Sequence, residues 1–189
     1  MRSTRVSLLA RVRDLGDAEA WERFYELYAP LLQRFARGLG LSASDAQEVR
    51  DQCLAVLARE LPRFDYDPAR GSFKSWLYRV ARAKVVDLRR EQRPAEGADW
   101  SRCAAHEPEP GAHWDSVWTA EHLLYALERV RPDVSARDFR AFEMLLVDDV
   151  SVDEVARALA MNANQVYKAK SRILARVRAK LRTLEAEGA

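Results

Sequence analysis

The sequence lacks the features that mark several large protein classes. Its 189 residues include two cysteines, Cys53 and Cys103, which give no disulfide framework, so a reducing cytoplasmic location is expected. No apolar run approaches the length of a membrane span, and the arginine-rich residues 1–13 lack the apolar core of a signal peptide. Neither a phosphate-binding glycine loop nor a nucleophile motif is present, so no enzymatic activity is expected.

Metal and cofactor sites are not expected either. Cys103, His106 and His113 carry zinc-ligating atoms, but no companion pair of ligands exists and histidines in a polar segment are usually plain surface residues. Asp87 is expected to pair with an arginine or lysine of its own helix rather than to form a carboxylate site. The function is therefore sought in binding.

Apolar residues recur at helical spacing along most of the chain, which predicts an all-α fold. Between Glu91 and Gly111, prolines and glycines remove any clear period, which predicts a flexible linker. The expected organisation is a helical domain over residues 1–93, a linker over 94–113, and a second helical domain over 114–189 that contains a helix-turn-helix.

The net charge of +2 conceals a strong segregation of charge. Residues 63–93 and 155–183 are basic, and the second of these segments contains no acidic residue, whereas residues 94–128 are acidic. A helix with so much positive charge on one face repels itself unless an anion neutralises it, and the phosphate backbone of nucleic acid is the usual anion. The pattern therefore predicts two nucleic-acid contacts and a connector that avoids them.

The C-terminal region has the layout of a helix-turn-helix. Ser151 and Glu154 predict a capping box that opens a short helix, and a tight turn and a long helix follow. If Val166 and Ile173 face the core, helical spacing turns a polar set of side chains outward, toward base edges and phosphates. A solvated amphipathic helix is the alternative, but the absence of acidic residues favours DNA. The predicted duplex contacts are Asn164, Gln165, Lys168, Ser171 and Arg172.

Residues 63–90 alternate aromatic and basic side chains, a pattern typical of single-stranded nucleic-acid binding, in which bases stack on rings and cations follow the backbone. Phe73 and Trp76 share an apolar stripe with Leu77 and are predicted to lie in the core. The predicted contacts to a melted strand are Phe64, Tyr66, Lys74, Tyr78, Arg79, Arg82, Lys84 and Arg89.

Three stretches together resemble a bacterial RNA polymerase sigma factor, and the small two-domain extracytoplasmic-function (ECF) class fits best. The resemblance covers residues 17–93 and 121–184, and FKSWLYRVAR is its most specific segment. The stretches are LYAPLLQRFARGLGLSASDAQEV, LPRFDYDPARGSFKSWLYRVARAKVVDLRR and VSVDEVARALAMNANQVYKAKSRILARVRAKL.

The resemblance implies a transcription initiation factor whose partners are core RNA polymerase and promoter DNA. Its first domain would bind the polymerase clamp through Glu48, Asp51 and Gln52, and would hold the minus-ten element as a melted strand with residues 63–72 as the pocket loop. Its second domain would read the minus-thirty-five element as duplex. Such a protein lowers the free-energy cost of unpairing bases without catalysing a bond change.

The chain departs from the family pattern at Arg50, which interrupts the acidic run of the clamp-binding helix, and at Ala83, where the family often has asparagine. Two other functions therefore stay open. One is a stand-alone helix-turn-helix regulator that binds duplex DNA without polymerase. The other is a sigma-like decoy that occupies an anti-sigma protein, which makes an anti-sigma protein a further candidate partner.

Overall fold

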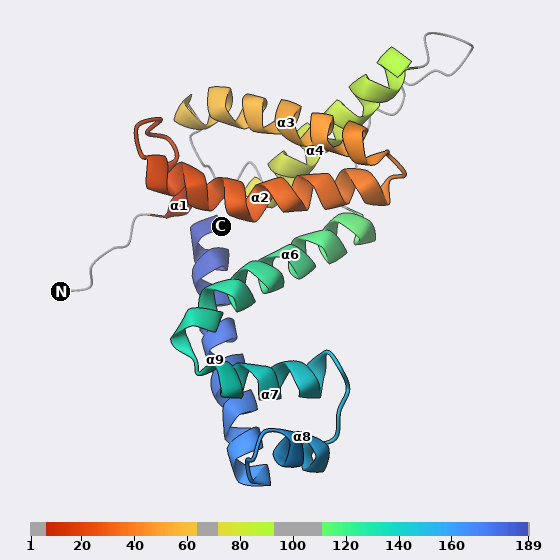
Figure 1. Cartoon of the computed structure of the whole chain (residues 1–189). Coiled ribbons are helices and arrows are strands. Elements are labelled where there is room, and N and C mark those ends of the chain that lie inside the picture. Colours follow the sequence, from red (N-terminus) through yellow and green to blue (C-terminus); the bar gives the residue numbers. More distant parts are fainter. Residues whose placement is uncertain (1–6, 64–71, 93–110, 189) are drawn as a thin grey trace, which may run out of the picture. The chain divides into compact units, whose positions relative to one another are not determined.

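The computed structural model describes residues 7–63, 72–92 and 111–188. These residues form helices joined by turns and contain no strand, which confirms the all-α prediction (Figure 1). The chain divides into two compact units, residues 1–121 with 185–189, and residues 122–184. The division falls inside a helix, and most of the predicted linker lies outside the described residues. The domain boundaries read from the sequence therefore stay a prediction.

The first unit is built on three long helices that pack against one another. Its elements are α1 (Leu8–Arg11), α2 (Ala18–Gly38), α3 (Ala43–Glu60), the 3-10 turn η1 (Leu61–Arg63), α4 (Phe73–Gln92) and the first half of α6 (Ala112–Val130). Phe24 of α2, Leu57 of α3 and Phe73 of α4 are fully buried. The Phe24 and Phe73 rings meet edge to face at 6.1 Å between centroids. The apolar faces of α2, α3 and α4 thus form one core.

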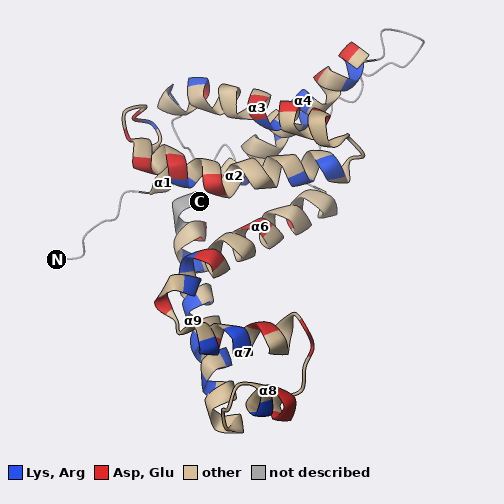
Figure 2. Ribbon diagram, in the orientation of Figure 1, with Lys and Arg blue, Asp and Glu red and all other residues tan. Residues whose placement is uncertain are grey.

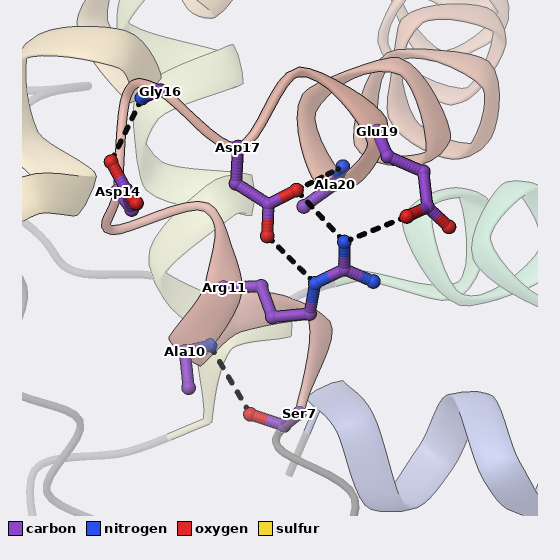
Figure 3. A network of polar contacts seen from close by, with 8 residues as sticks. All are labelled: Ser7, Ala10, Arg11, Asp14, Gly16, Asp17, Glu19 and Ala20. Atoms are coloured by element: carbon purple, nitrogen blue, oxygen red, sulfur yellow. Dashed lines mark hydrogen bonds and ion pairs between the residues drawn. The ribbon is translucent and has the colours of Figure 1, made fainter.

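Local signals set the ends of α2. Asp17 caps its first turn by accepting a hydrogen bond from the Ala20 amide at 3.1 Å. The Arg11 guanidinium also binds the Asp17 carboxylate, at 2.8 Å, and reaches Glu19 at 3.2 Å (Figure 3). Gly40, with φ of +87°, takes the left-handed conformation that ends the helix.

The Arg11 hydrogen bond, followed by that of the Ala20 amide, lowers the pKa of the Asp17 carboxyl. Its ordinary value is about 3.9. Because the folded value lies below the unfolded one, this interaction stabilises the fold above about pH 4 and is lost as the pH falls through the lowered pKa.

Cys53 lies fully buried on α3 and is a packing residue, as its place in the apolar stripe predicts. Burial raises the pKa of its thiol to about 12. At pH 8 roughly one thiol in ten thousand would then be ionised, and the thiolate is the reactive form. In a Cys103→Ser variant we expect Ellman's reagent to label no thiol in the native protein and one thiol in denaturant. Rapid labelling of the native variant would contradict the buried position of Cys53.

The second unit is a smaller helical bundle around two apolar clusters. It contains the rest of α6, the 3-10 turn η3 (Arg131–Asp133), α7 (Ala136–Leu146), α8 (Val152–Ala158) and most of α9 (Ala163–Gly188). Phe142 and Ile173 belong to the cluster that joins α6, α7 and α9, and Val155 and Val166 belong to the one that joins α8 to α7 and α9. The second cluster fixes the angle at which α9 leaves the turn.

Candidate nucleic-acid interface

The turn between α8 and α9 is fixed by reciprocal hydrogen bonds at the start of each helix. Glu154 donates its amide to the Ser151 hydroxyl at 3.4 Å and accepts the Ser151 amide at 3.2 Å, which confirms the predicted capping box. A second reciprocal pair was not predicted from the sequence. The Gln165 amide donates to the Asn162 side chain at 2.9 Å, and the Asn162 amide donates to the Gln165 side chain at 2.8 Å. These bonds hold α9 in a defined direction after a short turn at Ala160, where φ is +50°.

The outward face of α9 carries the predicted duplex contacts. Val166 and Ile173 are fully buried, as the sequence analysis assumed. Lysine and arginine residues recur along α9 (Figure 2). All five predicted residues are exposed: Asn164, Gln165, Lys168, Ser171 and Arg172. Their contacts with DNA stay a prediction.

Two of these side chains already have intramolecular roles. The Gln165 side chain caps its own helix through Asn162, so it is not free to swing toward a base without losing that bond. The Arg172 guanidinium binds the carboxylate of Asp138 on α7 at 3.0 Å. Asp138 thereby orients Arg172 and screens part of its charge. No local signal in the sequence relates these two residues, which are far apart along the chain.

Tyr167 is an exposed aromatic residue of α9 that was not among the predicted DNA contacts. It is 55% exposed, three residues after Asn164 and four before Ser171. Residues at that spacing are neighbours on a helix surface. An exposed ring beside a row of cations can pack against a sugar or a thymine methyl group. Its large apolar surface on an otherwise polar face was the available signal.

Asp138→Asn should free Arg172 while keeping the α7 cap, because the cap uses the Asp138 amide and the Ser135 hydroxyl. We expect duplex affinity to rise about threefold to tenfold for all sequences, with a steeper salt dependence and weaker base discrimination. Fluorescence anisotropy titrations at several salt concentrations measure all three. Asp153→Asn, at an exposed position on α8, is the matched control. An unchanged salt dependence would exclude Arg172 from the phosphate contacts.

The second candidate surface lies on α4. Lys74, Tyr78 and Arg82 are spaced by four residues and therefore share one side of the helix. The Lys74 ammonium pairs with Asp115 of α6 at 2.6 Å. The Tyr78 ring lies 5.6 Å from that of Trp114, also on α6. Two predicted strand contacts are thus engaged by the first half of α6.

The remaining strand candidates differ in availability. Lys84 pairs with Asp87 at 3.3 Å, as was expected for Asp87. Burial raises the pKa of the Cys53 thiol on α3, and the Lys84 charge lowers that pKa by a smaller amount. Arg89 donates to the Leu39 carbonyl. Arg79 and Arg82 form no ion pair with any of the residues that the structure describes. These two arginines are therefore the most available cations of the set.

Phe64 and Tyr66, the predicted aromatic contacts of the pocket loop, lie outside the described residues. The melted-strand surface can therefore be described on α4 alone.

The predicted polymerase contacts lie on one side of α3. The Gln52 amide donates to Glu48 at 3.1 Å, so these two side chains are already linked. Arg50, which departs from the family pattern, binds Asp51 at 2.8 Å and Gln33 of α2 at 3.3 Å. The Asp51 hydrogen bond raises the pKa of the Arg50 guanidinium. Arg50 thus ties α3 to α2 and offsets the charge of Asp51, so Glu48 carries the remaining negative charge of the run.

The described residues contain no group of three or more potential ligands that could hold a metal ion. Cys103 and His106 lie outside them, and the His113 ring stacks on Phe35 at 5.6 Å. Among the described helices, none is both long and apolar enough to span a bilayer.

Comparison with known proteins finds a family model that matches part of the first unit and relatives that are similar over most of the chain. Residues 24–94 match the family model described as sigma-70 region 2, which spans α3, α4 and most of α2. Over 141 residues the chain is 27% identical to the ECF RNA polymerase sigma factor RpoE of Cereibacter sphaeroides, covering 75% of this chain and 77% of that protein. Over 182 residues it is 26% identical to the RNA polymerase sigma factor NccH of Alcaligenes xylosoxydans xylosoxydans, covering 93% and 92%.

Proposed function

We infer from these similarities that the chain belongs to the extracytoplasmic-function class of RNA polymerase sigma factors and is a transcription initiation factor. Sigma factors bind core RNA polymerase and promoter DNA and are not themselves enzymes. The observation that carries the assignment is the region 2 match over residues 24–94, because it covers the helices that bear both the clamp and the strand candidates. We place the protein in the cytoplasm, where bacterial polymerase works.

We propose that the two units divide the promoter between them. The α4 surface would hold the melted minus-ten strand through Arg79 and Arg82, with Lys74 and Tyr78 joining once they are accessible. The exposed face of α9 would bind the minus-thirty-five duplex, with Lys168 and Arg172 on phosphates and Asn164 on a base. A stand-alone regulator would leave the region 2 segment without a role, so this alternative is not favoured.

We further propose that α3 contacts the polymerase through Glu48 and Gln52, with Asp51 held by Arg50. Gel filtration of the full chain with core polymerase tests this proposal. We expect the wild-type protein to co-elute, and Glu48→Arg to weaken the complex at least about tenfold, because it places a like charge against a surface suited to an acidic residue.

Glu22→Arg, at an exposed position on α2, is the matched control and should leave the complex intact. A wild-type protein that forms no complex with core polymerase would overturn the proposed function. It would leave the two alternatives, a stand-alone regulator that binds duplex DNA without polymerase and a decoy for an anti-sigma protein.

A further inference from the structure

The first half of α6, residues 112–121, packs on the outer surface of α2 and α4 within the first unit. Trp114 is fully buried, and its ring meets that of Phe35 at 4.9 Å, edge to face. Trp118 packs on Tyr28 at 5.8 Å between ring centroids. One buried tryptophan and a second packed beside it, one turn apart, make this a specific contact rather than a loose one.

Charged pairs surround the aromatic contact. Lys74 of α4 pairs with Asp115 at 2.6 Å and lies over the Trp118 ring at 5.6 Å from its centroid. At the other end of the segment, Arg34 of α2 forms an ion pair with Glu121, which is 5% exposed. The pairing of acidic residues on α6 with basic residues on α2 and α4 fixes the position of the segment.

Gly38, at the end of α2, adds a shape requirement. The His113 ring lies so close that a Cβ atom at position 38 would stand 2.2 Å from it. Any side chain there would force the imidazole to move away from its stack on Phe35.

This contact conflicts with the proposed function of α4. Lys74 cannot neutralise a DNA phosphate while its ammonium pairs with Asp115, and the Asp115 carboxylate itself repels phosphate. Tyr78 cannot stack on a base while its ring lies between Phe35 and Trp114, at 5.9 and 5.6 Å. Asp115, one of the acidic residues of the 94–128 segment, therefore takes the place at Lys74 that a DNA phosphate would occupy.

We propose that residues 112–121 form an intrinsic cover of the melted-strand surface, which must leave α4 before Lys74 and Tyr78 can bind single-stranded DNA. The proposal rests on the proposed function of α4. Because residues 112–121 belong to the same chain, they compete with single-stranded DNA for the α4 surface at a high effective concentration. Any partner that binds only the uncovered surface shifts the population toward it, so single-stranded promoter DNA would favour the open state.

The test uses the full chain and a fluorescein-labelled single-stranded oligonucleotide of mixed sequence. An Asp115→Asn, Gly38→Ala double variant removes one charge pair and displaces His113. Both positions are exposed, so the core is left intact. We expect it to bind the oligonucleotide about tenfold more tightly than the wild type, and Lys74→Ala in the double variant to cancel most of the gain. Glu22→Gln is the charge-matched control and should bind as the wild type does.

A double variant with a wild-type thermal midpoint and wild-type affinity would overturn the cover. A gain in affinity that survives Lys74→Ala would also overturn it, because the released surface would then not be α4. Trp114→Phe is a second way to loosen the cover while keeping an aromatic ring. It should also raise the affinity for the oligonucleotide. Complex formation with core polymerase is measured in parallel. If neither the wild type nor any variant binds polymerase, the proposed function fails. If all of them bind polymerase but have equal affinity for the oligonucleotide, only the cover proposal fails.

Discussion

Replacing Arg79 and Arg82 together with glutamate should reduce promoter opening by the complex with core polymerase about 100-fold. Neither arginine has an ion pair among the described residues, so their reversal breaks no ion pair there. In the proposed complex each would face the phosphates of the melted strand, and reversal replaces two attractions with two repulsions. Permanganate reactivity of unpaired thymines measures opening directly, and transcript yield measures its consequence.

An Arg13→Glu, Arg59→Glu double variant is the matched control, since both residues are exposed in the first unit and neither belongs to α4. It should retain promoter opening. Duplex binding by the second unit should survive in the α4 variant, because α9 is unchanged. Full opening by the Arg79, Arg82 variant would place the melted strand on another surface.

The second large effect is expected from Lys168→Glu. Lys168 is exposed on α9 and has no ion pair within the part of the chain that the structure describes. If it binds a phosphate, its reversal should weaken duplex binding about 30-fold, equally for all sequences, and should flatten the salt dependence. Asn164→Ala should instead change base preference with a smaller loss of affinity. Anisotropy titrations against a panel of duplexes separate the two outcomes.

Arg182→Glu is the control on the same helix. It is exposed and lies about 20 Å further along α9, at 1.5 Å per residue, so it should leave duplex binding nearly unchanged. If Arg182→Glu and Lys168→Glu weaken binding equally, the helix binds DNA along its length rather than at its first turns.

Local features of the fold were predictable from the sequence because each depends on residues a few positions apart. The Ser151–Glu154 box and the inward faces of Val166 and Ile173 are of this kind. Pro30 is less easily predicted, because proline disfavours a helix interior, yet α2 runs as one helix from Ala18 to Gly38. Its ring lies on the exposed side, so the helix continues with one backbone hydrogen bond fewer.

Contacts between residues far apart along the chain could not be predicted from the sequence. Periodicity places Tyr78 off the core stripe of α4, which correctly excludes it from the three-helix core. It cannot show that Trp114 covers the Tyr78 ring. Arg172 and Asp138 were each visible as charged residues, but only the fold of the second unit brings them to 3.0 Å. The cations of the candidate surfaces could be named from the sequence, whereas their partners on other helices could not.

The most direct test of the account is run-off transcription with core polymerase, the full chain and a library of genomic promoter fragments from the host. We expect a defined subset of fragments to produce transcripts only when the protein is present. The Arg79→Glu, Arg82→Glu double variant and the Lys168→Glu variant should each silence that subset. If no fragment is transcribed and the protein forms no complex with core polymerase, the chain is not an initiation factor.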